Sequence, residues 1–171
     1  ALADLAEKRD LKLIYDASHC FGVNYRGDSI LKWGDAATLS FHATKLFSTV
    51  EGGAIVFRNK TDLENARRLI NFGYYQNGQL GEWGINAKMS EIHAAFGLAS
   101  LDDVDTLIRN RLAQVKRYQQ LLEEIAVFPA IRPETQWNGA YCCLIFEDED
   151  EVFRAKDALA KHDIDSRQYF R

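Results

Sequence analysis

Short apolar runs bounded by polar residues mark the first part of the chain. Residues 2–9 have the spacing of an amphipathic helix. The length and polar flanks of the run at residues 11–15 predict a buried strand, and the runs at 36–41 and 54–57 are also predicted to be strands. The stretch Thr-Asp-Leu-Glu at 61–64 has the spacing of a capping box, which predicts a helix that begins there and ends near Asn71.

The helical pattern is strongest between Met89 and Ile125. Apolar residues recur there every three or four positions, as in an amphipathic helix. The segment 100–103 interrupts the pattern, so we expect a division into two helices. The preceding segment 73–88 is rich in Gly, Asn and Tyr and is predicted to be a loop.

A linker and a smaller block follow the long helical region. Residues 128–133 contain both prolines and are predicted to form the linker. Residues 140–146 have a β-like pattern, and a helix is expected at about 150–162. This pattern indicates one domain at 1–127 and the start of a second, smaller α/β domain at 128–171.

Strands that alternate with helices are typical of an α/β fold with a mainly parallel sheet. In such sheets, ligands bind beyond the carboxyl ends of the strands. Asp16 ends the first predicted strand, and the segment after Phe41 follows the second. We therefore expect both at the ligand-binding edge.

Composition excludes several classes of function. Of the 171 residues, 47% are apolar and 27% are charged, which is typical of a soluble globular protein. The 21 Lys and Arg against 25 Asp and Glu leave a net charge of −4, which argues against nucleic acid as the main partner. Three cysteines argue against a disulfide framework and fit a cytoplasmic location. No apolar run approaches the ~18 residues that a membrane span needs.

Asp16 allows two interpretations. The simpler one is a turn-forming Asp that bonds the local backbone. The functional one is a carboxylate at a strand end, aimed into a cleft, where it would hold a cationic ring nitrogen through a charge-assisted hydrogen bond.

Lys45 also allows two interpretations. A lysine just past an apolar strand is most often a solvated surface residue. A partly desolvated lysine instead loses its proton more readily, and its amine becomes a nucleophile that forms a Schiff base. The hydroxyls of Ser40 and Thr44 would then hold a phosphate beside it, and Gly52-Gly53 would let the backbone turn tightly between two strands.

Other polar groups are weaker candidates for a catalytic or metal-binding role. The spacing of Asp16, His19, Cys20 and His42 fits no standard zinc pattern, so we expect no metal site. The pair Cys142 and Cys143 lies in the β-like run and is expected only to pack.

Four segments occur in the order and with the gaps of one known family, and they are YDASHCFG at 15–22, GDAATLSFHATK at 34–45, EGGA at 51–54 and GINAKMSEIHAA at 84–95. They resemble the DegT/DnrJ/StrS aminotransferases, pyridoxal-phosphate enzymes that aminate keto sugars on nucleotides. The resemblance covers about residues 10–125 and continues more loosely to the end. It is closest to the branch that makes dTDP-4-amino-4,6-dideoxyglucose from the 4-keto sugar. It implies part of the large domain of fold type I of the pyridoxal-phosphate transferases.

The resemblance also implies roles for individual residues. Lys45 matches the Schiff-base lysine, and Asp16 matches the carboxylate on the pyridine nitrogen. His19 matches a position near the cofactor ring and its phenolic oxygen, and Ser40 matches a phosphate ligand. Asn86 matches an Asn that reaches the phosphate of the other subunit's cofactor, which implies a homodimer.

The chain departs from the family pattern in three respects. Lys88 stands where many members have Arg, so its role stays open. The Gly-Thr/Ser phosphate loop and the stacking aromatic, which members carry upstream, are not found, and the chain stops where the small C-terminal domain should continue. We therefore expect a truncated piece of an L-glutamate-dependent enzyme that is inactive alone. Two alternatives are a sugar dehydratase on the same scaffold, in which His replaces the Schiff-base Lys, and a non-catalytic α/β fragment that self-associates through its long helices.

Overall fold

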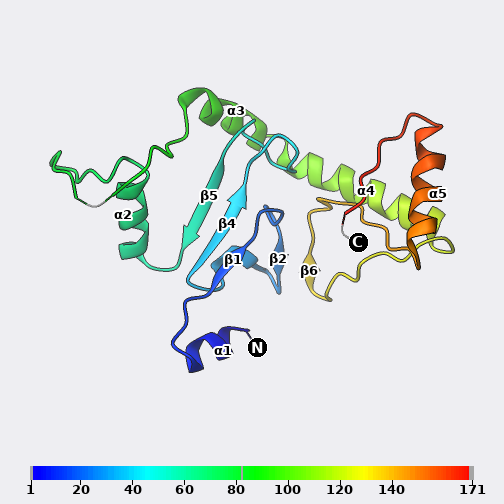
Figure 1. Ribbon diagram of the computed structural model, residues 1–171, viewed down its shortest axis with the longest axis horizontal. Helices are drawn as coiled ribbons and strands as arrows, with labels where there is room; N and C mark the ends of the chain where they lie inside the picture. Colours follow the sequence, from blue (N-terminus) through cyan, green and yellow to red (C-terminus); the bar gives the residue numbers. More distant parts are fainter. Residues whose placement is uncertain (1, 82, 170–171) are drawn as a thin grey trace. The chain divides into compact units, whose positions relative to one another are not determined.

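The computed structural model describes residues 2–81 and 83–169 (Figure 1). They form two compact units. The first contains the residues up to Leu112 together with Arg132–Ala140, and the second contains Ala113–Ile131 with the residues from Tyr141 onward. The division of the chain at residue 127, expected from the sequence, stays a prediction.

The first unit is built on a three-stranded sheet in the order β1-β4-β5. Its strands are β1 (Ile14–Asp16), β4 (Ala36–Ser40) and β5 (Gly53–Phe57), so all three strands predicted from the apolar runs are confirmed. The burial expected of the first strand is wrong, because Ile14 and Asp16 are exposed. The first begins later than expected, because the Leu13 backbone N–H donates to the Asp35 carboxylate at 2.8 Å and not to a neighbouring strand.

The strands of this sheet do not all run in one direction. β1 and β4 are parallel, with Asp16 opposite Thr38, whereas β4 and β5 are antiparallel, with Ser40 opposite Gly53. The α/β class is confirmed, but within this sheet the expected predominance of parallel pairs is not met. Parallel neighbours need a crossover connection, usually a helix, and the segment 41–52 between β4 and β5 contains none.

A second, smaller sheet has the order β3-β2-β6 and is antiparallel throughout. It consists of β2 (Asn24–Tyr25), β3 (Asp28–Ser29) and β6 (Thr135–Gln136), and a 3-10 helix at Ile30–Lys32 follows β3. Sequence reasoning missed these strands because two residues are too few to show alternation. An ion pair of 2.8 Å between Arg26 Nε and Glu134 Oε2 joins the turn between β2 and β3 to the residue that precedes β6.

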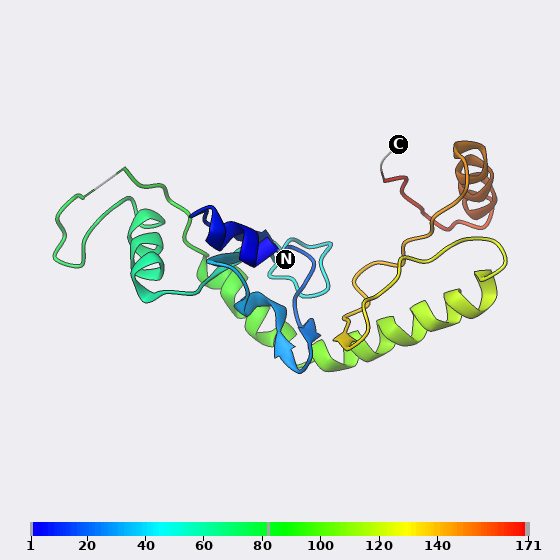
Figure 2. The ribbon, with the colours of Figure 1, turned by 90° about the horizontal axis from the view of Figure 1, so that it is seen from below.

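The helices follow the predicted pattern closely, and they are α1 (Leu2–Lys8), α2 (Lys60–Leu69), α3 (Glu91–Leu101), α4 (Val104–Leu122) and α5 (Glu149–Ala160). The expected break near 100–103 is confirmed, since α3 ends at Leu101 and α4 begins at Val104 (Figures 1 and 2). The predicted cap of α2 is wrong by two residues. Asn59 is the N-cap, and its side chain accepts a hydrogen bond of 2.8 Å from the Asp62 backbone N–H.

The second unit contains less β structure than its sequence suggested. The β-like run 140–146 forms only one isolated bridge, between Val127 and Ile145, with backbone bonds of 2.9 and 2.8 Å. Because no further strand pairs with this run among the described residues, Cys142 and Cys143 are exposed, and the expectation that they pack is wrong. In the part of the chain that the structure describes, no helix has the length and apolar character needed to cross a membrane.

The core of the first unit lies against the sheet where β1 and β4 end. Ala17, Ala37 and Leu39 are buried together, and the rings of Phe21 and Phe41 pack against them. This packing attaches the loops that follow β1 and β4 to a common apolar base.

Candidate active site

Two loops meet at the carboxyl ends of the parallel strands β1 and β4. Asp16 is the last residue of β1, and Ser40 is the last residue of β4. The first loop carries His19 and the second carries Lys45. Lys45 Nζ lies 2.7 Å from His19 Nε2, so the structure brings these two predicted site residues into direct contact.

Asp16 fits the simpler interpretation drawn from the sequence, a turn-forming residue that bonds the local backbone, and its role toward a ring nitrogen stays a prediction. Its Oδ1 accepts hydrogen bonds from the backbone N–H of Ser18, at 3.0 Å, and from the Ser18 hydroxyl. The hydroxyl bond and the backbone bond are the main causes that hold the pKa of Asp16 below its usual value, and the nearby basic groups of His19 and Lys45 lower it further. The local turn therefore keeps a carboxylate ionised beside the two basic groups.

His19 favours its neutral form. Its partial burial and the nearby Lys45 charge both lower the pKa of the imidazole, and Asp16 opposes them in part. A neutral Nε2 can accept a hydrogen bond from the Lys45 ammonium group, which has only donors. A neutral His19 that accepts this bond at Nε2 carries its ring proton on Nδ1.

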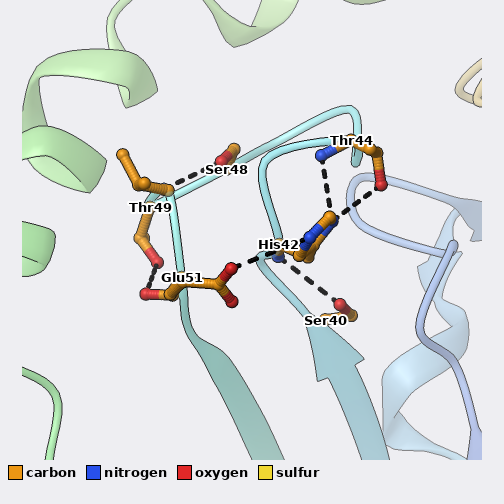
Figure 3. Close-up of polar contacts among 7 residues, drawn as sticks. Ser40, His42, Thr44, Ser48, Thr49 and Glu51 are labelled. Atoms are coloured by element: carbon orange, nitrogen blue, oxygen red, sulfur yellow. Dashed lines mark hydrogen bonds and ion pairs between the residues drawn. The ribbon is translucent and has the colours of Figure 1, made fainter.

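The loop that carries Lys45 is shaped by a histidine (Figure 3). His42 Nδ1 accepts the backbone N–H of Thr44 at 3.2 Å and lies 2.8 Å from the Thr44 hydroxyl. Its carbonyl accepts the Lys45 backbone N–H at 2.9 Å. Because a backbone N–H can only donate, Nδ1 of His42 is the acceptor of the Thr44 bond, and Nε2 on the other side of the ring faces Glu51 Oε1 at 3.7 Å.

The far end of the same loop returns tightly to the sheet. The buried Thr49 donates through its backbone N–H to the Phe41 carbonyl at 2.9 Å and through its hydroxyl to the Glu51 carbonyl at 2.8 Å. A Cβ at Gly52 would lie 2.2 Å from Thr49 Oγ1, so a side chain is excluded there. Val50 has a φ of +69°, a conformation that is rare for a β-branched residue. The tight turn expected from Gly52-Gly53 thus has a steric basis.

Aromatic rings join the two loops. Phe21, which follows His19 in the first loop, stacks on Phe47 of the second with ring centres 4.4 Å apart. Phe41 packs edge-on against both rings, at 6.0 and 5.0 Å. These contacts hold the backbones on either side of the His19 and Lys45 contact in a common cluster.

Ser40 lies beside this cluster, and Asn86 lies elsewhere in the first unit. The Ser40 hydroxyl accepts the His42 backbone N–H at 3.4 Å. Asn86 follows α2, forms a bridge with Asn71 and accepts a hydrogen bond of 2.6 Å from Lys88 Nζ. Within residues 2–81 and 83–169, no hydrogen bond links Asn86 to the other predicted site residues. Nor do those residues hold a group of three or more His, Cys, Asp or Glu side chains arranged to bind a metal ion.

Sequence reasoning missed Asn138, which contacts the first loop from a distant segment. Its side chain is fully buried, and its amide nitrogen donates to the carbonyls of His19 and Phe21. An isolated Asn between the linker at 128–133 and the β-like run at 140–146 carries no pattern that separates a buried amide from an exposed one, so no local signal was available.

Comparison with known proteins agrees with these motifs. The family model described as the DegT/DnrJ/EryC1/StrS aminotransferase family matches residues 1–171. The chain is 43% identical to a dTDP-4-amino-4,6-dideoxy-D-glucose transaminase of Shigella dysenteriae, across 99% of the chain and 47% of that protein. It is 36% identical to the Escherichia coli protein of the same name, across 97% of the chain and 46% of that protein. The chain therefore spans about half the length of these curated relatives.

Solved structures give the same fold. A DegT DnrJ EryC1 StrS aminotransferase from Brucella abortus superposes with a TM-score of 0.90 at 22% identity, over 99% of the chain and 45% of that protein. DesI, solved in the presence of its TDP-sugar product, superposes with a TM-score of 0.86 at 31% identity, over 99% of the chain and 44% of that protein. The expected partial fold type I architecture is confirmed.

Proposed function

The chain belongs to the DegT/DnrJ/EryC1/StrS aminotransferase family, and from that membership we propose that it carries much of the active site of a pyridoxal-phosphate-dependent aminotransferase. The observation that carries the proposal is the 2.7 Å contact between Lys45 Nζ and His19 Nε2. It lies at the edge of the sheet where β1 ends with Asp16. An amine, an imidazole and an ionised carboxylate gather there within one unit of the fold.

These side chains fit pyridoxal phosphate by their chemistry. When bound, this cofactor supplies an electron sink for the carbon that exchanges the amino group. Lys45 would hold the cofactor covalently and afterwards carry a proton on Nζ. Asp16 would keep a proton on the ring nitrogen, and its lowered pKa supports that role. His19 would orient the ring near its phenolic oxygen, and the Ser40 hydroxyl would bind the phosphate.

For the substrate, we propose a nucleotide-linked keto sugar, namely dTDP-4-keto-6-deoxyglucose, with L-glutamate as the amino donor. Two relatives named as dTDP-4-amino-4,6-dideoxy-D-glucose transaminases support this choice, at 43% and 36% identity. The structure of DesI with a TDP-sugar product supports a nucleotide-linked ligand for this fold.

We also propose a cytoplasmic homodimer without nucleic acid or membrane partners. Asn86 would act on the cofactor of the second subunit, which agrees with its lying apart from Lys45 in the hydrogen-bond network of one chain. Light scattering of the full-length protein measures this directly, and a strictly monomeric species would contradict the role given to Asn86.

The decisive experiment traps the covalent link to Lys45. The full-length protein that contains these residues is incubated with pyridoxal phosphate and reduced with borohydride, and its peptides are analysed by mass spectrometry. We expect the cofactor mass on the peptide that contains Lys45. Lys45→Ala should lose both this label and transamination with glutamate and the dTDP-linked keto sugar.

Lys60→Ala is the matched control, because Lys60 is an exposed lysine at the start of α2 that pairs with Glu64 at 3.6 Å. It should keep both the label and the activity. Full activity in Lys45→Ala would overturn the assignment, and label without amination of the keto sugar would overturn the proposed substrate alone.

A further inference from the structure

Asn138 is the largest fully buried side chain among the described residues, and it is polar. All of its hydrogen-bonding atoms are used for backbone groups. Nδ2 donates to the His19 carbonyl at 3.0 Å and to the Phe21 carbonyl at 2.8 Å, and Oδ1 accepts the Ala140 backbone N–H at 3.0 Å. A buried carboxamide with both donors and its acceptor matched is a specific arrangement, since each unmatched group would cost free energy.

The two carbonyls that Asn138 binds lie on either side of Cys20 in the loop after β1. This loop is a turn whose own backbone bonds join Cys20 to the Ala17 carbonyl at 2.9 Å and Val23 to the Cys20 carbonyl at 3.1 Å. Neither of these bonds involves the carbonyls of His19 and Phe21, and Asn138 donates to both carbonyls.

Both residues whose carbonyls bind Asn138 also contact the loop that carries Lys45. His19 extends from it to Lys45 at 2.7 Å, and Phe21 stacks on Phe47 in the loop that carries Lys45. The segment of Asn138 is also held by contacts other than those of Asn138 itself, because β6 pairs with β2 and Arg132 packs over the Tyr25 ring at 5.5 Å. A fixed segment 119 positions away in the sequence therefore sets the backbone from which His19 projects.

We propose that Asn138 is a positioning residue of the active site, which holds the His19 and Phe21 backbone so that the imidazole meets the Lys45 amine. This inference rests on the proposed function for the meaning of the site. Its test does not, because it needs neither cofactor nor substrate.

The test is an NMR titration of the His19 ring in the cofactor-free, full-length protein, with the resonance assigned by its absence in His19→Gln. In Asn138→Ala we expect the pKa of His19 to rise toward its ordinary value, because the ring leaves both its partial burial and the Lys45 charge. Lys45→Ala is the positive control and should shift the pKa of His19 in the same direction.

Gln136→Ala is the matched control, because it removes an exposed side-chain bond of 3.2 Å to Asn24 from the same segment and leaves the loop of His19 untouched. It should titrate like the unmodified protein. If Asn138→Ala does not fold, Asn138→Ser keeps one donor and should give a smaller shift in the same direction. A folded Asn138→Ala or Asn138→Ser with an unchanged His19 titration would overturn the proposal, whatever the protein's transaminase activity.

Discussion

At the residue scale, the site depends on two hydrogen-bonded pairs that set protonation before any ligand binds. Ser18 lowers the pKa of Asp16 through its hydroxyl and backbone donors, and burial together with Lys45 at 2.7 Å lowers the pKa of His19. The neighbouring positions 18 and 19 thus act on different partners, because the turn after β1 points one side chain back to the strand end and the other across to the second loop.

Asp16→Asn should keep the fold but lower the rate of transamination on the order of 10²-fold or more, because a charge-assisted bond to the cofactor's ring nitrogen is lost. Steady-state kinetics of the loaded full-length enzyme would measure the change. Circular dichroism should show no loss of structure, since Asp16 is exposed and its carboxamide replacement still accepts the Ser18 bonds. Unchanged turnover would show that Asp16 is only a turn residue.

The lowered pKa of His19 predicts how stability depends on pH. A histidine whose folded-state pKa lies below its ordinary value of 6.5 binds its proton more readily in the unfolded chain. The free energy of unfolding should therefore fall as pH decreases through 6.5 and level off below the folded-state pKa. Urea unfolding above and below pH 6.5 would measure this, and His19→Gln should reduce the difference. An equal pH dependence in that variant would contradict the assignment.

At the scale of the elements, short polar contacts determine where helices and loops begin. The N-terminus of α2 lies at Asn59 and not at Thr61, because only Asn59 has the extended backbone of an N-cap and a side chain that reaches the Asp62 N–H. The loop from β4 to β5 is likewise closed at both ends, by His42 with Thr44 and by Thr49 with the Glu51 carbonyl (Figure 3).

Asn59→Ala should lower the free energy of unfolding by about 1 kcal/mol, the usual cost of losing an N-cap. Thr61→Ala, two positions away, should change it by less than about 0.5 kcal/mol, because Thr61 lies inside the helix and is not the cap. Urea unfolding of both variants would compare them. Equal losses, or a larger loss in Thr61→Ala, would return the cap to the position that the capping-box spacing predicts.

At the scale of the whole molecule, the first unit contains all of the predicted cofactor-binding residues, and four of them gather at one edge of its sheet. Asp16, His19, Ser40 and Lys45 all lie at or just beyond the ends of β1 and β4. The chain spans 47% of the length of the Shigella dysenteriae relative. Any further cofactor contacts can therefore be tested only in the full-length protein.

The 171 residues alone should bind pyridoxal phosphate weakly or not at all and should not transaminate. A bound phosphate needs several converging donors, which a Gly-rich turn at a helix N-terminus commonly supplies. The only donors proposed for the phosphate are Ser40 of one chain and Asn86 of a second copy. Titration of the purified chain with the cofactor, followed by an assay with glutamate and the keto sugar, measures both properties. Tight stoichiometric binding with turnover would contradict this prediction.

Local patterns predicted a large part of this structure. The strands β4 and β5 and the division between α3 and α4 follow from apolar spacing, which records which face of an element is buried. The β-like run at 140–146 was misjudged because a strand exists only where a neighbour accepts its hydrogen bonds, and only Ile145 has such a neighbour among the described residues.

The sequence by itself determined the family, the class of fold and the identity of the residues that carry the proposed chemistry, because ordered motifs and apolar spacing are properties of the chain. Only the tertiary structure decided which of them meet. The 2.7 Å contact of His19 with Lys45 depends on two parallel strands that end at one edge of the sheet. The hydrogen bonds from Asn138 to the loop of His19 depend on β6 pairing with a strand more than a hundred residues earlier. Such contacts are set by register and burial between distant segments, which no local pattern encodes.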